Sequence, residues 1–206
     1  MGTESIAEPR RSYAKGDRRK REIVTVAMGL FAADGYTSTS MVQVATACGV
    51  SRAGLLHHFP SKENLLTAVL SARDRIDGDT FFAGADPHED GLDFLDRLVE
   101  VVIHNTSQRE IVALFTMLSA EASDPAHPAH DYFVDRYRRL RRDIAAALTD
   151  LERRGLLRSG VDPDSASADI VALMDGLQVQ WLIDHDSVDI PEHLRAHLDG
   201  LTRTPT

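Results

Sequence analysis

The stretch TSTSMVQVATACGVSRAGLLHHFPSKEN, residues 37–64, decides the fold. It predicts two short helices joined by a tight turn, followed directly by the start of a third helix. Ala45, Gly49 and Leu55 stand where such a bend needs a small residue, a turn glycine and a buried apolar residue. A helix-turn-helix of this kind places its second helix in the major groove of DNA. The stretch therefore predicts a DNA-reading motif over residues 41–60.

Capping and stopping residues mark the helix ends on both sides of this motif. Each predicted helix starts at a Ser or Asp that can accept a backbone hydrogen bond and ends at Gly or Pro. Ser40 also forms a capping-box pattern with Gln43. The starts are Asp17, Ser40, Ser51 and Ser61, and the stops are Gly35, Gly49 and Pro60. Because these signals agree in order, residues 17–62 are predicted to form one helical DNA-binding domain.

The remainder of the chain, residues 63–206, is predicted to be a second, helical domain for regulation and dimerisation. Apolar residues recur there at helical spacing, and no segment alternates for long enough to predict a strand. Residues 1–16 hold few apolar residues and are predicted to be a disordered basic arm. The expected breaks are residues 82–91 and 124–129, and the expected late helix starts are Asp162 and Asp189. The predicted fold class is all-α, with about nine helices.

Charge is distributed unevenly along the chain. The net charge of −9 alone argues against a nucleic-acid partner. However, residues 1–75 hold 11 Lys and Arg against 7 Asp and Glu, whereas residues 76–206 hold 12 against 25. The acidic part would repel phosphates and confine DNA contact to the basic end. An equally good interpretation is that the acidic surface only aids solubility.

Composition also restricts the compartment. The single cysteine, Cys48, allows no intramolecular disulfide, which suits a reducing cytosol. No apolar run approaches the roughly 18 residues that span a bilayer, and the basic start lacks the apolar core of a signal peptide. We therefore expect a cytoplasmic protein without a membrane partner.

The line GYTSTSMVQVATACGVSRAGLLHHFPSKENLL, residues 35–66, resembles the DNA-binding domain of the tetracycline-repressor (TetR) family of bacterial regulators. The resemblance covers about residues 18–70, and residues 174–184 are similar to a late helix of many members. Leu56 departs from the pattern, because the family usually has a phosphate-binding tyrosine there. The matching positions are Gly35-Tyr36, Thr39, Val44-Ala45, Gly49-Val50-Ser51, Leu55-Leu56, His58-Phe59 and Lys62-Glu63.

Side-chain chemistry predicts a role for each part of the DNA-binding surface. Arg18 and Arg19 offer phosphate or minor-groove contacts that are largely blind to sequence. Arg52 is the only long donor in the recognition helix, so we expect it to bind a guanine, with roughly 1–3 kcal/mol of discrimination. The other positions offer phosphate contacts or a close approach to DNA. The full predicted set is Arg18, Arg19, Thr39, Ser40, Gln43, Ser51, Arg52, Ala53, Gly54, Leu56, His57 and Lys62.

The resemblance further implies a homodimer and a small-molecule effector. The helices around residues 133–152 and 164–184 are long enough to pair with their copies as a four-helix bundle. Leu173, Leu177 and Trp181 are candidate anchors or, equally well, intrachain core. An effector would act among the middle helices, and a carboxylate there would favour a lipophilic cation. Its predicted contacts are Phe94, Leu98, Phe115, Leu118, Met174, Leu177, Gln178 and Trp181, with Glu121 or Asp175 as the charged group.

Other functions fit the sequence less well. No nucleophile with a base, paired carboxylates, phosphate loop or zinc spacing is present, so we expect no enzyme activity, no metal and no cofactor. His57 and His58 do not form a metal pair, because neighbours on a helix point in different directions. A module for acidic partners would leave the turn at Gly49 without a purpose. The predicted function is a repressor released from a palindromic operator by an effector; an activator or an effector-independent regulator of the same fold is the alternative.

Overall fold

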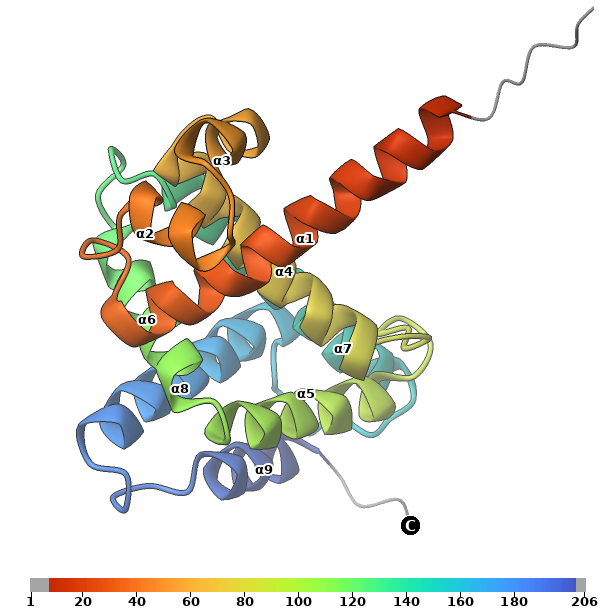
Figure 1. Cartoon of the computed structure of the whole chain (residues 1–206). Helices are drawn as coiled ribbons and strands as arrows, with labels where there is room; N and C mark the ends of the chain where they lie inside the picture. The colour runs from red at the N-terminus through yellow and green to blue at the C-terminus, as the bar shows by residue number, and fades with distance from the viewer. Residues whose placement is uncertain (1–7, 203–206) are drawn as a thin grey trace, which may run out of the picture. The chain divides into compact units, whose positions relative to one another are not determined.

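The computed structural model describes residues 8–202, and this range contains nine α-helices and no β-strand (Figure 1). The helices are α1 (Glu8–Asp34), α2 (Met41–Ala47), α3 (Arg52–His58), α4 (Lys62–Phe81), α5 (Gly91–Thr106), α6 (Arg109–Glu121), α7 (His130–Arg153), α8 (Pro163–Ile183) and α9 (Ile190–Leu201). The prediction of an all-α chain with about nine helices is confirmed. The chain divides into two compact units, and the division falls after Ala72, within α4.

The first unit contains α1, α2, α3 and the first part of α4. The Ser40 hydroxyl accepts a hydrogen bond from the Gln43 backbone at 3.2 Å, and the Gln43 side chain accepts one from the Ser40 backbone at 2.7 Å. The Ser51 hydroxyl accepts from the Gly54 backbone at 3.0 Å and so caps α3. Between these caps, Gly49 has a φ of +65°, a left-handed conformation that glycine adopts without steric cost. The predicted helix-turn-helix is therefore present.

The apolar faces of these helices form the core of the first unit. α2 contacts both α1 and α3, so the two helices of the motif are packed as well as capped. Leu55 of α3 is fully buried, which anchors that helix by one face with roughly 2 kcal/mol of burial free energy. The buried apolar residues of the unit include Ile23, Ala27, Phe31, Val44, Ala45, Leu55, Phe59, Leu65, Leu66, Val69 and Leu70.

The first helix begins earlier than the sequence predicted. It starts at Glu8 instead of after a cap at Asp17. Residues 8–16, predicted to belong to a disordered arm, therefore form the first turns of α1, and the remaining arm residues 1–7 lie outside the described range. The physical reason is propensity, because this segment has a proline in its first turn followed by Ala, Arg and Lys, which favour helix.

The boundary between the units also differs from the predicted one. The sequence placed the second domain from residue 63, whereas the first unit extends to Ala72. The reason is the apolar face of early α4, where Leu65, Leu66 and Val69 are fully buried. These turns of α4 complete the core of the first unit.

The second unit is a helical bundle in which α5 and α8 each contact both α7 and α9, while α6 contacts α5 and α8 (Figure 1). Gly91 lies where α5 approaches α7, because a Cβ at this position would stand 2.2 Å from the Ala147 carbonyl oxygen. The Gly91 N–H donates to the buried Asp150 carboxylate at 3.0 Å. The bundle core includes Leu95, Leu98, Val102, Ile144, Leu148, Leu151, Ile170, Leu177, Trp181, Leu194 and Leu198.

Candidate nucleic-acid interface and ligand cavity

The start of α3 presents an exposed polar surface. Ser51, Arg52 and Ala53 are exposed, while Leu55 on the opposite face is buried. Within residues 8–202, Arg52 makes no hydrogen bond or ion pair, so its guanidinium is available to an external acceptor. The geometry therefore offers one long cationic donor on a helix whose position is fixed by a cap, a turn and a core residue.

Arg19, predicted to contact DNA, has a structural role in this unit. Its guanidinium donates to the Cys48 carbonyl at 2.7 Å and to the Glu22 carboxylate at 2.8 Å. Cys48 is the C-cap of α2, so Arg19 ties α1 to the end of the first motif helix. The neighbouring Arg18 is different: its side chain is 70% exposed and has only a loose ion pair with Glu22 at 3.5 Å. Arg18 is thus the freer of the two arginines.

Lys62 and Thr39 are also engaged within the first unit. The Lys62 ammonium donates to the Thr37 carbonyl at 3.1 Å and lies 4.4 Å from the centre of the Tyr36 ring. Thr39 is only 1% exposed, and its hydroxyl donates to the Gly35 carbonyl at 2.9 Å. The Thr39 hydroxyl thus closes the loop before α2, and a contact of this helix start with a phosphate stays a prediction.

The other residues of the predicted interface lie at or near the surface. Ser40, Gln43 and His57 are exposed, although Ser40 and Gln43 use their side chains to cap α2. Gly54 and Leu56 are partly exposed on α3. The structure thus brings the predicted residues of α2 and α3 together in one unit, and their contact with DNA stays a prediction.

A cavity of about 680 Å³ lies within the second unit. Its walls come from the last turns of α4, from the loop between α4 and α5, and from α5, α6, α7 and α8. Six of the ten residues predicted to contact an effector line it, namely Phe94, Leu98, Phe115, Met174, Asp175 and Gln178. Whether these residues bind a ligand stays a prediction.

The other four predicted effector contacts lie elsewhere. Leu118, Leu177 and Trp181 are at most 6% exposed and do not line the cavity. Glu121 also lies outside the lining and is within 3.6 Å of His127. The helical spacing of the sequence predicted that these positions lie on apolar faces of their helices. It did not predict which of those faces line the cavity.

For two of the candidate dimer anchors, burial favours the alternative that they are intrachain core. Leu177 and Trp181 belong to the core of their own chain, and Leu173 packs partly against it. The outward face of α8 from Ala172 onward carries Ala172, Gly176, Val179, Gln180 and Ile183, while Asp164, Ser165 and Asp169 are exposed nearer its start. The exposed residues from Ala172 onward are uncharged, whereas α7 exposes mainly charged residues, among them Asp135, Arg138, Arg139, Arg141 and Arg142.

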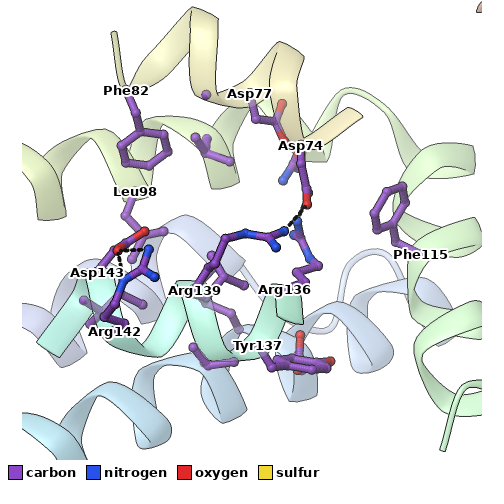
Figure 2. Close-up of a pocket in the computed structure, with 18 of the residues that line it drawn as sticks. Asp74, Asp77, Phe82, Leu98, Phe115, Arg136, Tyr137, Arg139, Arg142 and Asp143 are labelled. Atoms are coloured by element: carbon purple, nitrogen blue, oxygen red, sulfur yellow. Dashed lines mark hydrogen bonds and ion pairs between the residues drawn. The ribbon is translucent and has the colours of Figure 1, made fainter. Parts of the chain in front are cut away.

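A charged cluster joins α4 to α7 at the cavity wall. Asp74 of α4 accepts hydrogen bonds from Arg136, from Arg139 at 3.2 Å and from the Tyr132 hydroxyl at 2.8 Å. Figure 2 shows Arg136 and Arg139 projecting from α7 toward Asp74, while Tyr137 projects from the other side of α7. Burial lowers the pKa of Arg136 to about 10, so the guanidinium stays protonated at neutral pH. Sequence reasoning missed this cluster because its members are about sixty residues apart.

Asp175 provides a second polar feature of the cavity. The Tyr137 hydroxyl donates to its carboxylate at 2.8 Å. Burial raises the pKa of Asp175, although the hydrogen bond from Tyr137 and the charge of Arg136 act in the opposite direction. Burial, together with the charge of Asp175, also raises the pKa of Tyr137 to about 12. The carboxylate is therefore held in a poorly solvated site.

The described part of the chain shows neither a metal-binding cluster nor a membrane-spanning helix. Between residues 8 and 202, no three His, Cys, Asp or Glu side chains gather in a way that could hold a metal ion. No helix in that range combines the length and the apolar character needed to cross a membrane.

Both units match known family models. Residues 23–69 match the model described as bacterial regulatory proteins of the TetR family, and residues 93–203 match the C-terminal model of BetI-type transcriptional repressors. The second match alone covers more than half of the chain. The chain belongs to the TetR family. It is therefore a transcriptional regulator rather than an enzyme, and the resemblance stated from residues 35–66 is confirmed.

Similar proteins share this architecture over nearly the whole chain. The regulator TtgR of Pseudomonas putida is 25% identical over 187 residues, which cover 88% of each chain. A regulator from Saccharomonospora viridis, crystallised with choline, superposes with a TM-score of 0.77 at 24% identity, over 91% of this chain and 100% of that chain. NalD of Pseudomonas aeruginosa is the secondary repressor of a multidrug efflux pump. It superposes with a TM-score of 0.69 at 24% identity, over 93% of this chain and 100% of the NalD chain. At these identities the two structures support the fold alone.

Proposed function

We propose that this TetR-family regulator is a homodimeric repressor that binds a palindromic operator in the cytoplasm and leaves it when a small molecule occupies the cavity. The observation that carries the proposal is the exposed start of α3, where Arg52 has no hydrogen-bond or ion-pair partner among the described residues. A side chain fixed at its base and free at its tip is what base recognition in the major groove requires. Relatives such as BepR of Brucella suis, named a transcriptional repressor, support the sign of regulation.

The contacts to DNA divide into two classes. Arg52 is assigned to a base edge, with Ala53 and Gly54 permitting the close approach of α3. Arg18 and His57, both exposed, are assigned to phosphates, where contacts add affinity for any sequence. Arg19, with both its recorded acceptors inside the first unit, is assigned to stability rather than to DNA.

The outward face of α8 is proposed to pair with a second copy of the chain. Ile183 is 81% exposed, which is costly for a monomer. Val179, 42% exposed, stands at the border between this face and the cavity, which it also lines. Ala172 and Gly176 lie on the same face, and their small size permits two helices to approach closely. Two copies would present two α3 helices to the two halves of a symmetric site.

The cavity is proposed to hold the effector. Its volume of about 680 Å³ falls within the range of small-molecule sites, roughly 300–1,000 Å³. Asp74 lies on its wall in α4, the helix that continues from the first unit into the second. An effector that binds one arrangement of α4 better than another shifts the DNA-binding population by that difference in affinity.

A binding experiment tests the DNA-reading role. An operator is selected from a pool of random DNA, and gel shifts at two salt concentrations then compare it with unselected DNA. We expect Arg52→Ala to lose roughly tenfold of the preference for the operator, because a bidentate base contact is removed. Arg18→Ala should weaken binding to both DNAs alike, and a single half-site should bind much more weakly than the palindrome.

Two outcomes would contradict the proposal. One is a selection that enriches no sequence. The other is that Arg52→Ala and Arg18→Ala each lose the same fraction of their affinity on operator as on unselected DNA. Arg52 would then not be distinguished from Arg18 as a base-contacting residue.

A further inference from the structure

The charged residues that line the cavity are not equally satisfied. Asp74 is paired with Arg136 and Arg139, and Arg142 with Asp143. A third acidic residue of the lining, Asp77, is paired with Arg73. In the part of the chain that the structure describes, Asp175 alone among the lining carboxylates has no ion pair. Asp175 is half-buried, and the charge of Arg136 acts on it without forming an ion pair. A poorly solvated carboxylate without a directly bonded cation favours an incoming positive charge.

The surroundings of Asp175 add acceptors and one spare hydroxyl. The Tyr137 hydroxyl donates to one oxygen of the Asp175 carboxylate, and no described residue is recorded as a donor to the other oxygen. Thr116 also lines the cavity, and its buried hydroxyl oxygen has no hydrogen-bond partner among the described residues. Gln178, one turn along α8 from Asp175, lines the same cavity and can supply a further acceptor.

Aromatic rings continue from this polar group along the cavity wall. The centre of the Tyr137 ring lies 6.4 Å from that of Phe133, which in turn lies 6.3 Å from that of Phe115. Ring faces attract organic cations, and the attraction is stronger when water is excluded. The Arg136 guanidinium already lies 5.5 Å from the centre of the Phe115 ring, so Tyr137 and Phe133 are the rings left for an incoming cation. Apolar residues such as Phe94, Leu98 and Met174 line the remaining wall. Charge, rings and apolar wall together describe a site for one positive charge on an apolar body.

We propose that the cavity binds a lipophilic organic monocation, whose charged nitrogen is held by Asp175 and whose apolar body lies along Phe94, Leu98 and Met174. This inference rests on the proposed effector role of the same cavity. An anion fits less well, because Arg136 and Arg139 are already paired with Asp74, whereas Asp175 has no ion pair among the described residues. The volume of about 680 Å³ also calls for a body larger than a small headgroup.

Calorimetric titration of the full-length protein without DNA tests the ligand class. The probes are octyltrimethylammonium, octyl sulfate, neutral octanol and choline. We expect octyltrimethylammonium to bind more tightly than the other three, because only it combines the charge with a body that fills the apolar wall. Tighter binding of octyl sulfate than of octyltrimethylammonium would overturn the proposal.

Asp175→Asn identifies the residue that recognises the charge. It should weaken octyltrimethylammonium binding by roughly tenfold or more and leave octanol binding unchanged. Glu121→Gln is the matched control, since Glu121 lies outside the cavity lining, and it should bind the cation as the unaltered protein does. An unchanged affinity of Asp175→Asn for the cation would overturn the assignment.

Stability separates lost recognition from lost folding. Because burial disfavours the ionised form of Asp175, its neutral replacement should melt at the same temperature as the unaltered protein or higher. The regulatory role is measured separately, by adding each probe to the operator complex. Cation binding without release of DNA supports the ligand class and contradicts the effector role, whereas release by octyl sulfate alone contradicts the ligand class and keeps the effector role.

Discussion

The motif of the first unit is held largely by neighbours in sequence, whereas the cavity of the second is held by distant pairs. Ser51 caps α3 through Gly54, three residues away. In the second unit the hydrogen bond from Tyr137 to Asp175 spans 38 positions, and that from Gly91 to Asp150 spans 59. The geometry of a local cap is set by residues within three or four positions of it and depends little on how distant helices pack. Contacts between distant helices depend on how those helices pack, so they can respond to what fills the space between them.

Two glycines sharpen this comparison and give the largest expected effect. At Gly91, a Cβ would meet the backbone of Ala147, which cannot move aside without shifting α7. We expect Gly91→Ala to lower the free energy of unfolding by about 3 kcal/mol, as measured by urea denaturation. At Gly49 nothing lies within 4 Å, so Gly49→Ala meets only the strain of a left-handed backbone, about 1 kcal/mol. Equal losses for the two variants would break the distinction.

Substitution of Asp150 should give the next largest effect. From α7, its carboxylate accepts a hydrogen bond from the first backbone N–H of α5. The carboxylate is 1% exposed and accepts from the Gly91 N–H. Asp150→Ala should lower the free energy of unfolding by about 2 kcal/mol at pH 7, since a buried donor loses its charged acceptor. Asp150→Asn should lose less, because its amide oxygen can still accept. An Asp150→Ala protein as stable as the unaltered one would contradict this assignment.

The pH dependence of that loss has a definite sign. Burial alone would raise the pKa of Asp150, but the hydrogen bond from Gly91 and the charges of Arg154 and Arg153 bring it below the ordinary value of 3.8. A carboxyl group with a lowered pKa stabilises the fold above its unfolded pKa, and this stability disappears as the pH falls through the folded value. The advantage over Asp150→Ala should therefore be constant near neutrality and shrink below about pH 4.

The helix-turn-helix of the first unit could be predicted from the sequence nearly residue by residue because its signals are local, whereas the start of α1 and the end of the unit could not. Ser40, Gly49 and Ser51 each carry their information within three or four positions of the chain. Two side chains of that unit escaped the prediction for the opposite reason. Arg19 and Lys62 bond to carbonyls 29 and 25 positions away, and nothing near them in sequence indicates that they are engaged.

In the second unit, periodicity located the helices but not the surfaces they share. It placed Asp175 and Gln178 at the cavity, yet it also included Leu177 and Trp181, which lie on the core face of the same helix. The partners of Asp74 could not be foreseen, because a charged residue on an amphipathic helix looks the same whether it faces water or a cavity. Burial, which decides between these, is a property of the packed bundle.

The smallest expected effect lies in the cap of the recognition helix. Ser51→Ala removes the acceptor for the Gly54 N–H and should cost about 1 kcal/mol in urea denaturation. Ser51→Asn should restore that stability, because asparagine caps helices about as well as serine. Since the change is local, neither variant should alter the affinity of the cavity for octyltrimethylammonium, measured by the same titration as above. If Ser51→Ala also weakened that binding, the geometry of the cavity would depend on a cap in the first unit. The contrast between local caps and distant pairs would then fail.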